Sequence, residues 1–125
     1  MSCSCDYDEY AAVYVAKRII ARKQHKCSEC STPILAGEQY ERVGSFFDGA
    51  WGTYRTCSRC LALRDFVEAH VPCMCWQHHS MRSDVIETAR EYAHEGPGLL
   101  FGAYRREVLI KRARLLAQSA AKGGA

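Results

Sequence analysis

"HKCSECSTPILAGEQYERVGSFFDGAWGTYRTCSRCLALRD", residues 25–65, decides the fold, because it holds two Cys-x-x-Cys pairs on either side of a predicted β-hairpin. The pairs are Cys27/Cys30 and Cys57/Cys60. Two β-like runs, GEQYERVGSFF and AWGTYRTC, flank Asp48-Gly49, a dipeptide that tolerates the positive φ angles of a tight type I′ turn. The hairpin should therefore bring the two cysteine pairs together at its open end.

The segment after Cys60 predicts a helix. In LALRDFVEAH, apolar or partly apolar side chains recur at i, i+3, i+4 and i+7, which gives one apolar face, and Val71-Pro72 should end the helix. Cys57 and Cys60 would then lie at the helix start, where the partial positive charge of the backbone favours thiolates. Four thiolates are the ligands of a closed structural zinc site. We expect one Zn²⁺ to be held by Cys27, Cys30, Cys57 and Cys60.

A disulfide framework, a redox centre and four buried free cysteines are the alternatives for these thiols. The acidic start MSCSCDYDEY lacks the apolar region of a signal peptide, and no run of 18 apolar residues predicts a membrane span. We therefore expect the protein in the cytoplasm, a reducing compartment in which structural disulfides are rare. A redox role for Cys-x-x-Cys would need a βαβ context, which the sequence does not predict.

The chain has eight cysteines in four close pairs, so a second metal site is expected. Because the hairpin joins the inner pairs, the outer pairs Cys3/Cys5 and Cys73/Cys75 are left to bind a second Zn²⁺, which would tie residues 1–10 to residues 71–82. His78 or His79 could replace one of the two N-terminal cysteines as a ligand. The absence of a second metal is the remaining alternative. A cross-braced pairing is disfavoured because it would separate the pairs that the hairpin joins.

The length of 125 residues suits one domain. We expect an α+β fold with a zinc-stabilised core at residues 19–70, a helical extension at 83–118 and a disordered tail at 119–125. The extension divides at Gly-Pro-Gly into two C-terminal helices, residues 84–94 after a Ser83 cap and residues 99–118. Residues 10–26 fit either a strand or a helix, and extended structure is favoured for residues 19–26.

The order of cysteine knuckle, β-hairpin and second cysteine pair at a helix start resembles the treble-clef zinc finger over residues 19–70. The resemblance implies that Cys27 and Cys30 lie on the knuckle and that Cys57 and Cys60 lie on the helix. Some nucleases of the HNH class share this architecture, but they need histidines on or beside the hairpin to bind a divalent ion and activate water. No histidine occurs between Cys30 and Cys60, so a nuclease is the least favoured function. A zinc deaminase needs Pro-Cys-x-x-Cys, and VPCMC is one residue too short. We expect a protein that is not an enzyme.

The net charge of +3 is unevenly distributed, and residues 99–125 alone carry six Lys or Arg against one Glu. This asymmetry favours contact with DNA, RNA or an acidic protein, although a solvated face of an amphipathic helix is the simpler interpretation. Aromatic side chains of the hairpin could stack on bases: Tyr40, Phe46, Phe47, Trp51 and Tyr54. The candidate binding residues are Arg105, Arg106, Lys111, Arg112, Arg114, Lys17, Arg18, Arg22 and Lys23.

The motifs HKCSEC, GEQYERV, DGAWGTYRTCSRC, LALRD and PCMCWQH together resemble small zinc-finger-like proteins that bacteriophages and prophages encode. The resemblance covers roughly residues 17–80, and the cysteine spacing is its most specific part. It implies a protein of the bacterial host cytoplasm that modulates or inhibits a host protein or protein–nucleic-acid machine, for example in CRISPR immunity or transcription. Non-catalytic binding is therefore the leading expectation, and direct DNA or RNA binding is the alternative.

Overall fold

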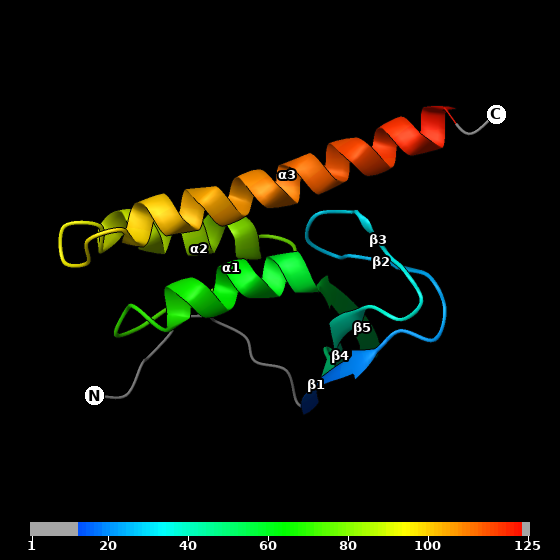
Figure 1. Ribbon diagram of the computed structural model, residues 1–125. Helices are drawn as coiled ribbons and strands as arrows, with labels where there is room; N and C mark the ends of the chain where they lie inside the picture. Colours follow the sequence, from blue (N-terminus) through cyan, green and yellow to red (C-terminus); the bar gives the residue numbers. More distant parts are fainter. Residues whose placement is uncertain (1–12, 124–125) are drawn as a thin grey trace.

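The computed structural model describes residues 13–123, which fold into two small sheets and three helices (Figure 1). This architecture confirms the α+β class. The elements in chain order are β1 (Val13–Ile20), β2 (His25–Lys26), β3 (Pro33–Ile34), β4 (Gln39–Phe47), β5 (Ala50–Cys57), α1 (Ser58–Glu68), α2 (Met81–Glu91) and α3 (Leu99–Gly123).

The larger sheet has the antiparallel order β1-β4-β5, and β4 and β5 form the predicted hairpin. Asp48 and Gly49 at its turn have φ angles of 50° and 78°, so both residues adopt the positive φ that a type I′ turn requires. The ambiguous segment before the first cysteine pair is a strand from Val13, because it pairs along its whole length with β4, from Val13 opposite Phe46 to Ile20 opposite Gln39. The second sheet is a short pairing of β2 with β3 around the first cysteine pair.

The three helices pack together on one side of the larger sheet (Figure 1). Helix α1 contacts β4 and β5, while α2 and α3 pack on α1 and on each other. Fully buried side chains from all three helices form one core that is continuous with the cysteine pairs, among them Leu63, Val67, Met81, Val85, Ala103 and Ile110. The cysteine region and the helical extension are therefore one packed unit.

The helix boundaries differ from the predicted ones at four places. Helix α1 ends at Glu68, before Val71-Pro72, and α2 begins at Met81 after Ser80 instead of after Ser83 and ends at Glu91 instead of residue 94. Helix α3 continues to Gly123, so residues 119–123, expected to be disordered, are helical. Although α3 has 25 residues, no helix among residues 13–123 has the length and apolarity needed to cross a membrane.

Helices α1 and α3 approach closely at Gly102. A Cβ atom built there would lie 2.6 Å from Cε1 of Phe66 and closer still to its Cζ atom. The aromatic ring is also in contact with Arg106, whose guanidinium carbon lies 3.9 Å from the ring centroid. The ring of Phe66 therefore occupies the space that only glycine leaves open.

We expect Gly102→Ala to destabilise the protein. Overpacking of this kind typically costs about 1–3 kcal/mol, and contacts this far below 3.0 Å on an aromatic ring favour the upper end. The better helix propensity of alanine returns at most about 1 kcal/mol, so a net loss of about 2 kcal/mol should appear in denaturant unfolding. The added variant Phe66→Leu should recover part of that loss. Gly44→Ala is the matched control, because a Cβ there meets nothing within 4 Å. A Gly102→Ala protein as stable as the parent would show that the two helices can separate at little cost.

Candidate metal centre

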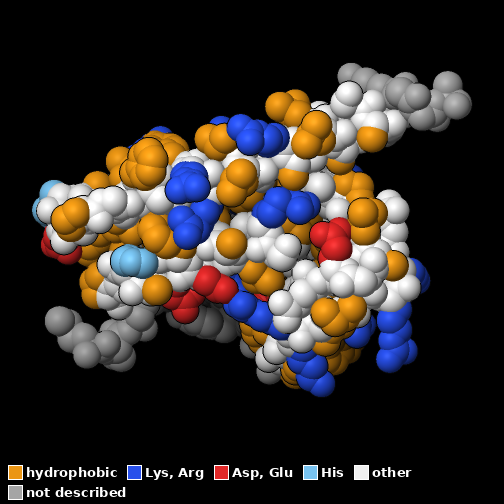
Figure 2. Space-filling view, viewed as in Figure 1, with side chains coloured by type: hydrophobic (Ala, Val, Ile, Leu, Met, Phe, Trp, Pro, Cys, Tyr) orange, Lys and Arg blue, Asp and Glu red, His pale blue; other side chains and the backbone are white. Residues whose placement is uncertain are grey.

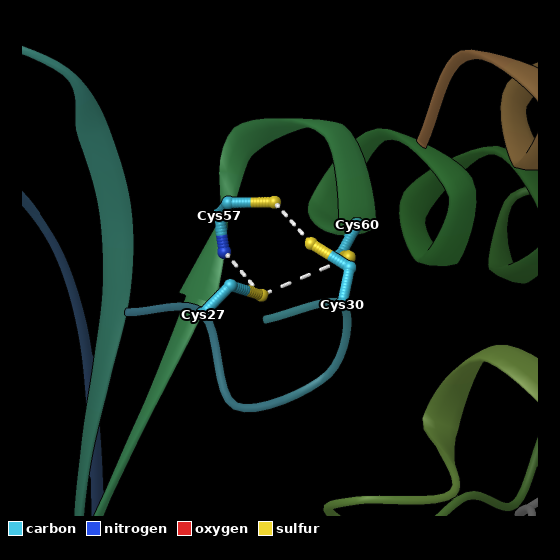
Figure 3. A group of neighbouring side chains, drawn as sticks. All are labelled: Cys27, Cys30, Cys57 and Cys60. Carbon is cyan, nitrogen blue, oxygen red and sulfur yellow. Dashed lines mark hydrogen bonds between the residues drawn. The ribbon is translucent and has the colours of Figure 1, made fainter. Parts of the chain in front are cut away.

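The two cysteine pairs meet at one end of the hairpin, as Figure 3 shows. Cys27 and Cys30 lie on the turn between β2 and β3, Cys57 is the last residue of β5, and Cys60 lies in the first turn of α1. All four side chains are at most 3 % exposed. The turn, the hairpin and the helix each position part of this cysteine quartet, which we define as Cys27, Cys30, Cys57 and Cys60.

The spacing of the sulfur atoms suits a tetrahedral cation. The Sγ atoms of Cys27 and Cys60 lie 3.9 Å apart, those of Cys30 and Cys57 lie 3.6 Å apart, and all four lie within 4.8 Å of one another. A tetrahedron with Zn–S bonds of about 2.3 Å has S–S edges of about 3.8 Å. A disulfide would need about 2.05 Å. The quartet could therefore hold a metal ion such as zinc.

Backbone hydrogen bonds shape the turn that carries Cys27. Its Sγ atom accepts the N–H groups of Glu29 and Cys57, both at 3.4 Å. Such bonds favour a thiolate over a thiol. The turn is also fixed to β5, because the Ser28 N–H donates to the Arg55 carbonyl oxygen at 2.6 Å and the Arg55 N–H donates to Ser28 Oγ at 2.9 Å. The sulfur positions are thus held by backbone contacts as well as by packing.

The four thiols perturb one another strongly because they are buried in contact. Hydrogen bonds, first of all with Cys27, lower the pKa of Cys30 far below its usual range. Hydrogen bonds with Cys27 and then with Cys30, together with burial, raise the pKa of Cys57 and of Cys60. Four buried thiolates would repel one another, and a divalent cation removes that repulsion, so metal binding would release protons from this group.

Glu29, which sequence analysis did not identify, connects the quartet to the helical extension. Its carboxylate accepts the backbone N–H of His79 at 2.6 Å and the N–H of Met81 at 3.0 Å. The carboxylate thereby satisfies free N–H groups at the start of α2, where negative charge is also favourable. This contact explains why α2 begins at Met81. Arg82 of α2 in turn pairs with Glu107 of α3. The available signal in the sequence was a carboxylate between the two cysteines of the first pair. That signal does not identify the partner, because the His79 N–H lies 50 residues away in the chain.

The predicted outer site falls partly outside the described residues, because Cys3 and Cys5 precede Val13. The Sγ atoms of Cys73 and Cys75 lie 3.9 Å apart and are half-buried. Within residues 13–123, neither cysteine belongs to a cluster of three or more ligating groups. Both cysteines are disulfide-bonded in the structure. The second zinc ion, which needs their thiolates, stays a prediction.

The two alternative ligands of the outer site have other contacts. The His78 ring stacks on Tyr54 at a centroid distance of 4.0 Å, and its Nε2 lies at hydrogen-bond distance, 2.9 Å, from the Tyr14 hydroxyl. Burial lowers the pKa of His78 to about 4, so its ring is neutral at pH 7. His79 Nδ1 donates to the Ser28 carbonyl oxygen at 3.3 Å. Both rings thus help to pack residues 76–79 against the sheet and the cysteine turn.

A network of four ion pairs joins the sheet to α1. Two are close paired contacts, and two are longer contacts at 4.0 Å, from Arg18 Nε to Glu41 and from Arg64 Nε to Asp65. Arg64 donates two hydrogen bonds to Glu41, at 2.9 and 2.7 Å, and both side chains are buried. Arg18 makes the same kind of paired contact with Asp65, at 2.8 and 2.9 Å, in a more exposed position. Arg18, a predicted binding residue, therefore has its guanidinium engaged on the side of the sheet that faces α1.

The other predicted binding residues divide between two surfaces. Lys17, Arg22 and Lys23 are exposed on or near β1, whereas the remaining basic residues lie on α3. Arg106 is held against Phe66 and also donates to the Gly102 carbonyl oxygen at 3.1 Å. The exposed members on α3 are Arg105, Lys111, Arg112 and Arg114. The structure does not bring the two basic groups into one site.

Comparison of the chain with protein-family models, with curated proteins and with solved structures gave no match.

Proposed function

We propose that the protein is a non-catalytic zinc-binding module built on a treble clef, with one Zn²⁺ held by the cysteine quartet. The observation that carries the proposal is the closed set of four buried sulfur atoms at tetrahedral spacing. The order of a β2–β3 cysteine turn, the β4–β5 hairpin and α1 supports the treble clef. Zinc is the cation that four thiolates at this spacing suit best.

The absence of catalysis is proposed from the ligand set. Four protein ligands fill a tetrahedral zinc ion and leave no position for a reactive water. Among residues 13–123, no histidine or carboxylate joins the cysteine cluster. A treble-clef nuclease would need such a group. We therefore expect no cleavage of plasmid DNA with Mg²⁺ or Mn²⁺, and cleavage that survives purification and is lost in a quartet variant would contradict this proposal.

The proposed activity is binding to a protein or to a protein–nucleic-acid machine through α3. Hydrophobic and basic side chains are interspersed along this helix, whose C-terminal turns extend beyond α1 and α2 (Figures 1 and 2). Phe101, Leu115 and Leu116 are 73 %, 64 % and 65 % exposed. An exposed amphipathic helix with basic flanks fits an apolar groove with an acidic rim. A bacterial host cytoplasm and a phage-encoded modulator of CRISPR or transcription components are proposed from the sequence resemblance alone.

Affinity capture from bacterial lysate tests this surface. We expect a defined protein to be retained by the parent after nuclease treatment and lost with Leu115→Glu/Leu116→Glu, because the two charges would be buried in the apolar groove of the partner. Leu35→Glu is the matched control, since Leu35 is 53 % exposed near β3 and far along the chain from α3. Capture that is unchanged in the α3 variant, or that is lost after nuclease treatment, would contradict a protein contact at α3.

The metal content of the purified protein tests the second proposed ion, with Cys3, Cys5, Cys73 and Cys75 as its ligands. We expect two zinc ions per chain and the loss of one in Cys73→Ser/Cys75→Ser, measured by native mass spectrometry. The quartet ion should remain in that variant because its ligands lie on other elements. A parent protein that binds a single zinc ion would contradict the second site and leave the quartet as the zinc site.

A further inference from the structure

Within residues 13–123, the larger sheet has one face that α1 covers and one on which none of the three helices packs. Glu41 and Arg18 lie on the covered face, since they pair with Arg64 and Asp65 of α1. Side chains alternate between faces along a strand, so Lys17 and Arg42 lie on the opposite face. We call this opposite face the outer face and define it by Val15, Lys17, Arg42, Trp51, Thr53 and Arg55, all of which line its grooves.

Three cations form a row straight across the outer face. Lys17 is the register partner of Arg42, and Arg42 is the register partner of Arg55, so β1, β4 and β5 each contribute one positive charge. Like charges directly opposite one another destabilise a sheet. Among the described residues, none of the three has an ion pair with a carboxylate, and no Asp or Glu lines either groove.

Protection of sheet edges does not account for this row. Charged residues on edge strands prevent sheets from pairing with other chains, which would explain Lys17 on β1 and Arg55 on β5. Arg42 is on the central strand β4, whose two edges are already paired. A positive charge between two others has no role in that protection, and it indicates an anionic ligand on the face.

Two grooves that share Arg42 in their linings extend from the row. One, of about 300 Å³, includes Lys17, Arg42 and Trp51, and the other, of about 1120 Å³, includes Arg42, Arg55, Arg22 and Lys23. Trp51 is 66 % exposed, and its ring lies 5.3 Å from that of Phe46. An exposed tryptophan ring supported from one side offers a flat apolar surface next to a line of positive charge.

We propose that the outer face binds single-stranded nucleic acid, with phosphates on Lys17, Arg42 and Arg55 and a base stacked on Trp51. A base can stack on an aromatic ring only when it is unpaired, and cations beside aromatic rings are the common arrangement of single-strand sites. A duplex would present its phosphates to the row but no base to Trp51. This inference goes beyond the protein contact proposed for α3 and does not depend on it.

Fluorescence anisotropy with labelled oligo-dT and oligo-U, measured from about 50 to 200 mM salt, tests the proposal on the zinc-loaded protein. Three phosphate contacts predict a slope of log K against log salt of about −2, and Arg42→Gln should make that slope about 0.7 less steep. Trp51→Ala should weaken binding roughly 5- to 150-fold with the slope unchanged. Binding of either polymer supports the proposal. A preference for one of them shows whether the ligand is DNA or RNA, since only RNA offers a 2′-hydroxyl.

Removal of equal charge from α3 is the matched control. Arg105→Gln/Arg112→Gln/Arg114→Gln should leave oligonucleotide affinity within a few-fold, whereas Lys17→Gln/Arg42→Gln/Arg55→Gln should abolish it at the higher salt. Zinc content and thermal melting of each variant establish that it is folded. The proposal is overturned by no binding at low salt, by equal competition from a duplex, by equal loss in both triple variants, or by full affinity in Trp51→Ala. Leu115→Glu/Leu116→Glu should keep oligonucleotide binding, so the α3 contact and this one can fail separately.

Discussion

Cys60→Ser is expected to unfold the protein at ordinary temperature. Cys60 is fully buried, and its sulfur lies 3.9 Å from that of Cys27, so the variant removes one of four metal ligands from the centre of the core. Structural zinc supplies about 10–16 kcal/mol in small zinc modules, which is comparable to the whole stability of a domain, about 5–15 kcal/mol. A serine hydroxyl is a poor substitute for a thiolate, and most of that contribution should be lost.

Circular dichroism melting and metal content measure this effect together. The variant should show no cooperative transition and less than one quartet zinc per chain, and a strong chelator added to the parent should reproduce the loss of structure. Ser58→Ala is the matched control, because Ser58 is exposed in the same turn of α1. A Cys60→Ser protein that keeps the melting curve of the parent would show that the quartet is not structural.

The cysteine quartet and the hairpin could be predicted from sequence because each depends on short-range chemistry. Asp48-Gly49 favours a single turn type, and once that turn forms, the strands bring Cys27 and Cys30 to the start of α1. The spacing within each pair then allows both sulfurs to converge on one ion. Few other arrangements satisfy these local constraints.

The face of the sheet on which each side chain of β1 lies could not be predicted from sequence, because it depends on the long-range register with β4. The sequence left residues 10–26 open between a strand and a helix, with extended structure favoured for residues 19–26, and it did not indicate which face of a strand would be covered. Pairing with β4 places Arg18 against Asp65 of α1 and Lys17 on the opposite side, beside Arg42. Two adjacent basic residues that looked equivalent in the sequence thus have different environments.

The prediction that α2 begins after Ser83 was wrong for a related reason. Ser83 matched the usual capping residue, but the carboxylate of Glu29 binds the N–H groups of His79 and Met81. A cap supplied from 50 residues away leaves no local pattern. The basic residues Arg42 and Arg55 were missed in the same way, since only the three-strand register aligns them with Lys17.

Glu41→Gln should destabilise the protein by up to about 3–5 kcal/mol, the cost of leaving a buried charge without its partner. Among residues 13–123, Arg64 then keeps only a longer ion pair, with Asp65 at 4.0 Å. The Glu41 and Arg64 side chains are 8 % and 7 % exposed, and Arg64 also lies 4.8 Å from the Trp76 ring centroid, so water cannot replace the lost carboxylate. Asp65→Asn is the matched control. It breaks a similar paired contact with Arg18 and the longer contact with Arg64. The Arg18 and Asp65 side chains are both more than 40 % exposed, and exposed pairs contribute about 0–1 kcal/mol.

The difference in unfolding free energy between the parent and Glu41→Gln should also depend on pH. The hydrogen bonds from Arg64 hold the pKa of Glu41 below its ordinary value of 4.5. A carboxylate with a lowered folded-state pKa stabilises the protein fully above the unfolded pKa and loses that contribution as pH falls through the folded value. The difference in unfolding free energy between the two proteins should therefore be constant above about pH 5 and become smaller below pH 4.5. Metal release in acid affects both proteins equally, so it cancels from this difference. Denaturant unfolding across this range measures the difference. Arg64→Met added to Glu41→Gln should recover stability, because it removes the buried cation that has lost its closest partner. A double variant less stable than Glu41→Gln would show that packing of Arg64, rather than its charge, accounts for the loss.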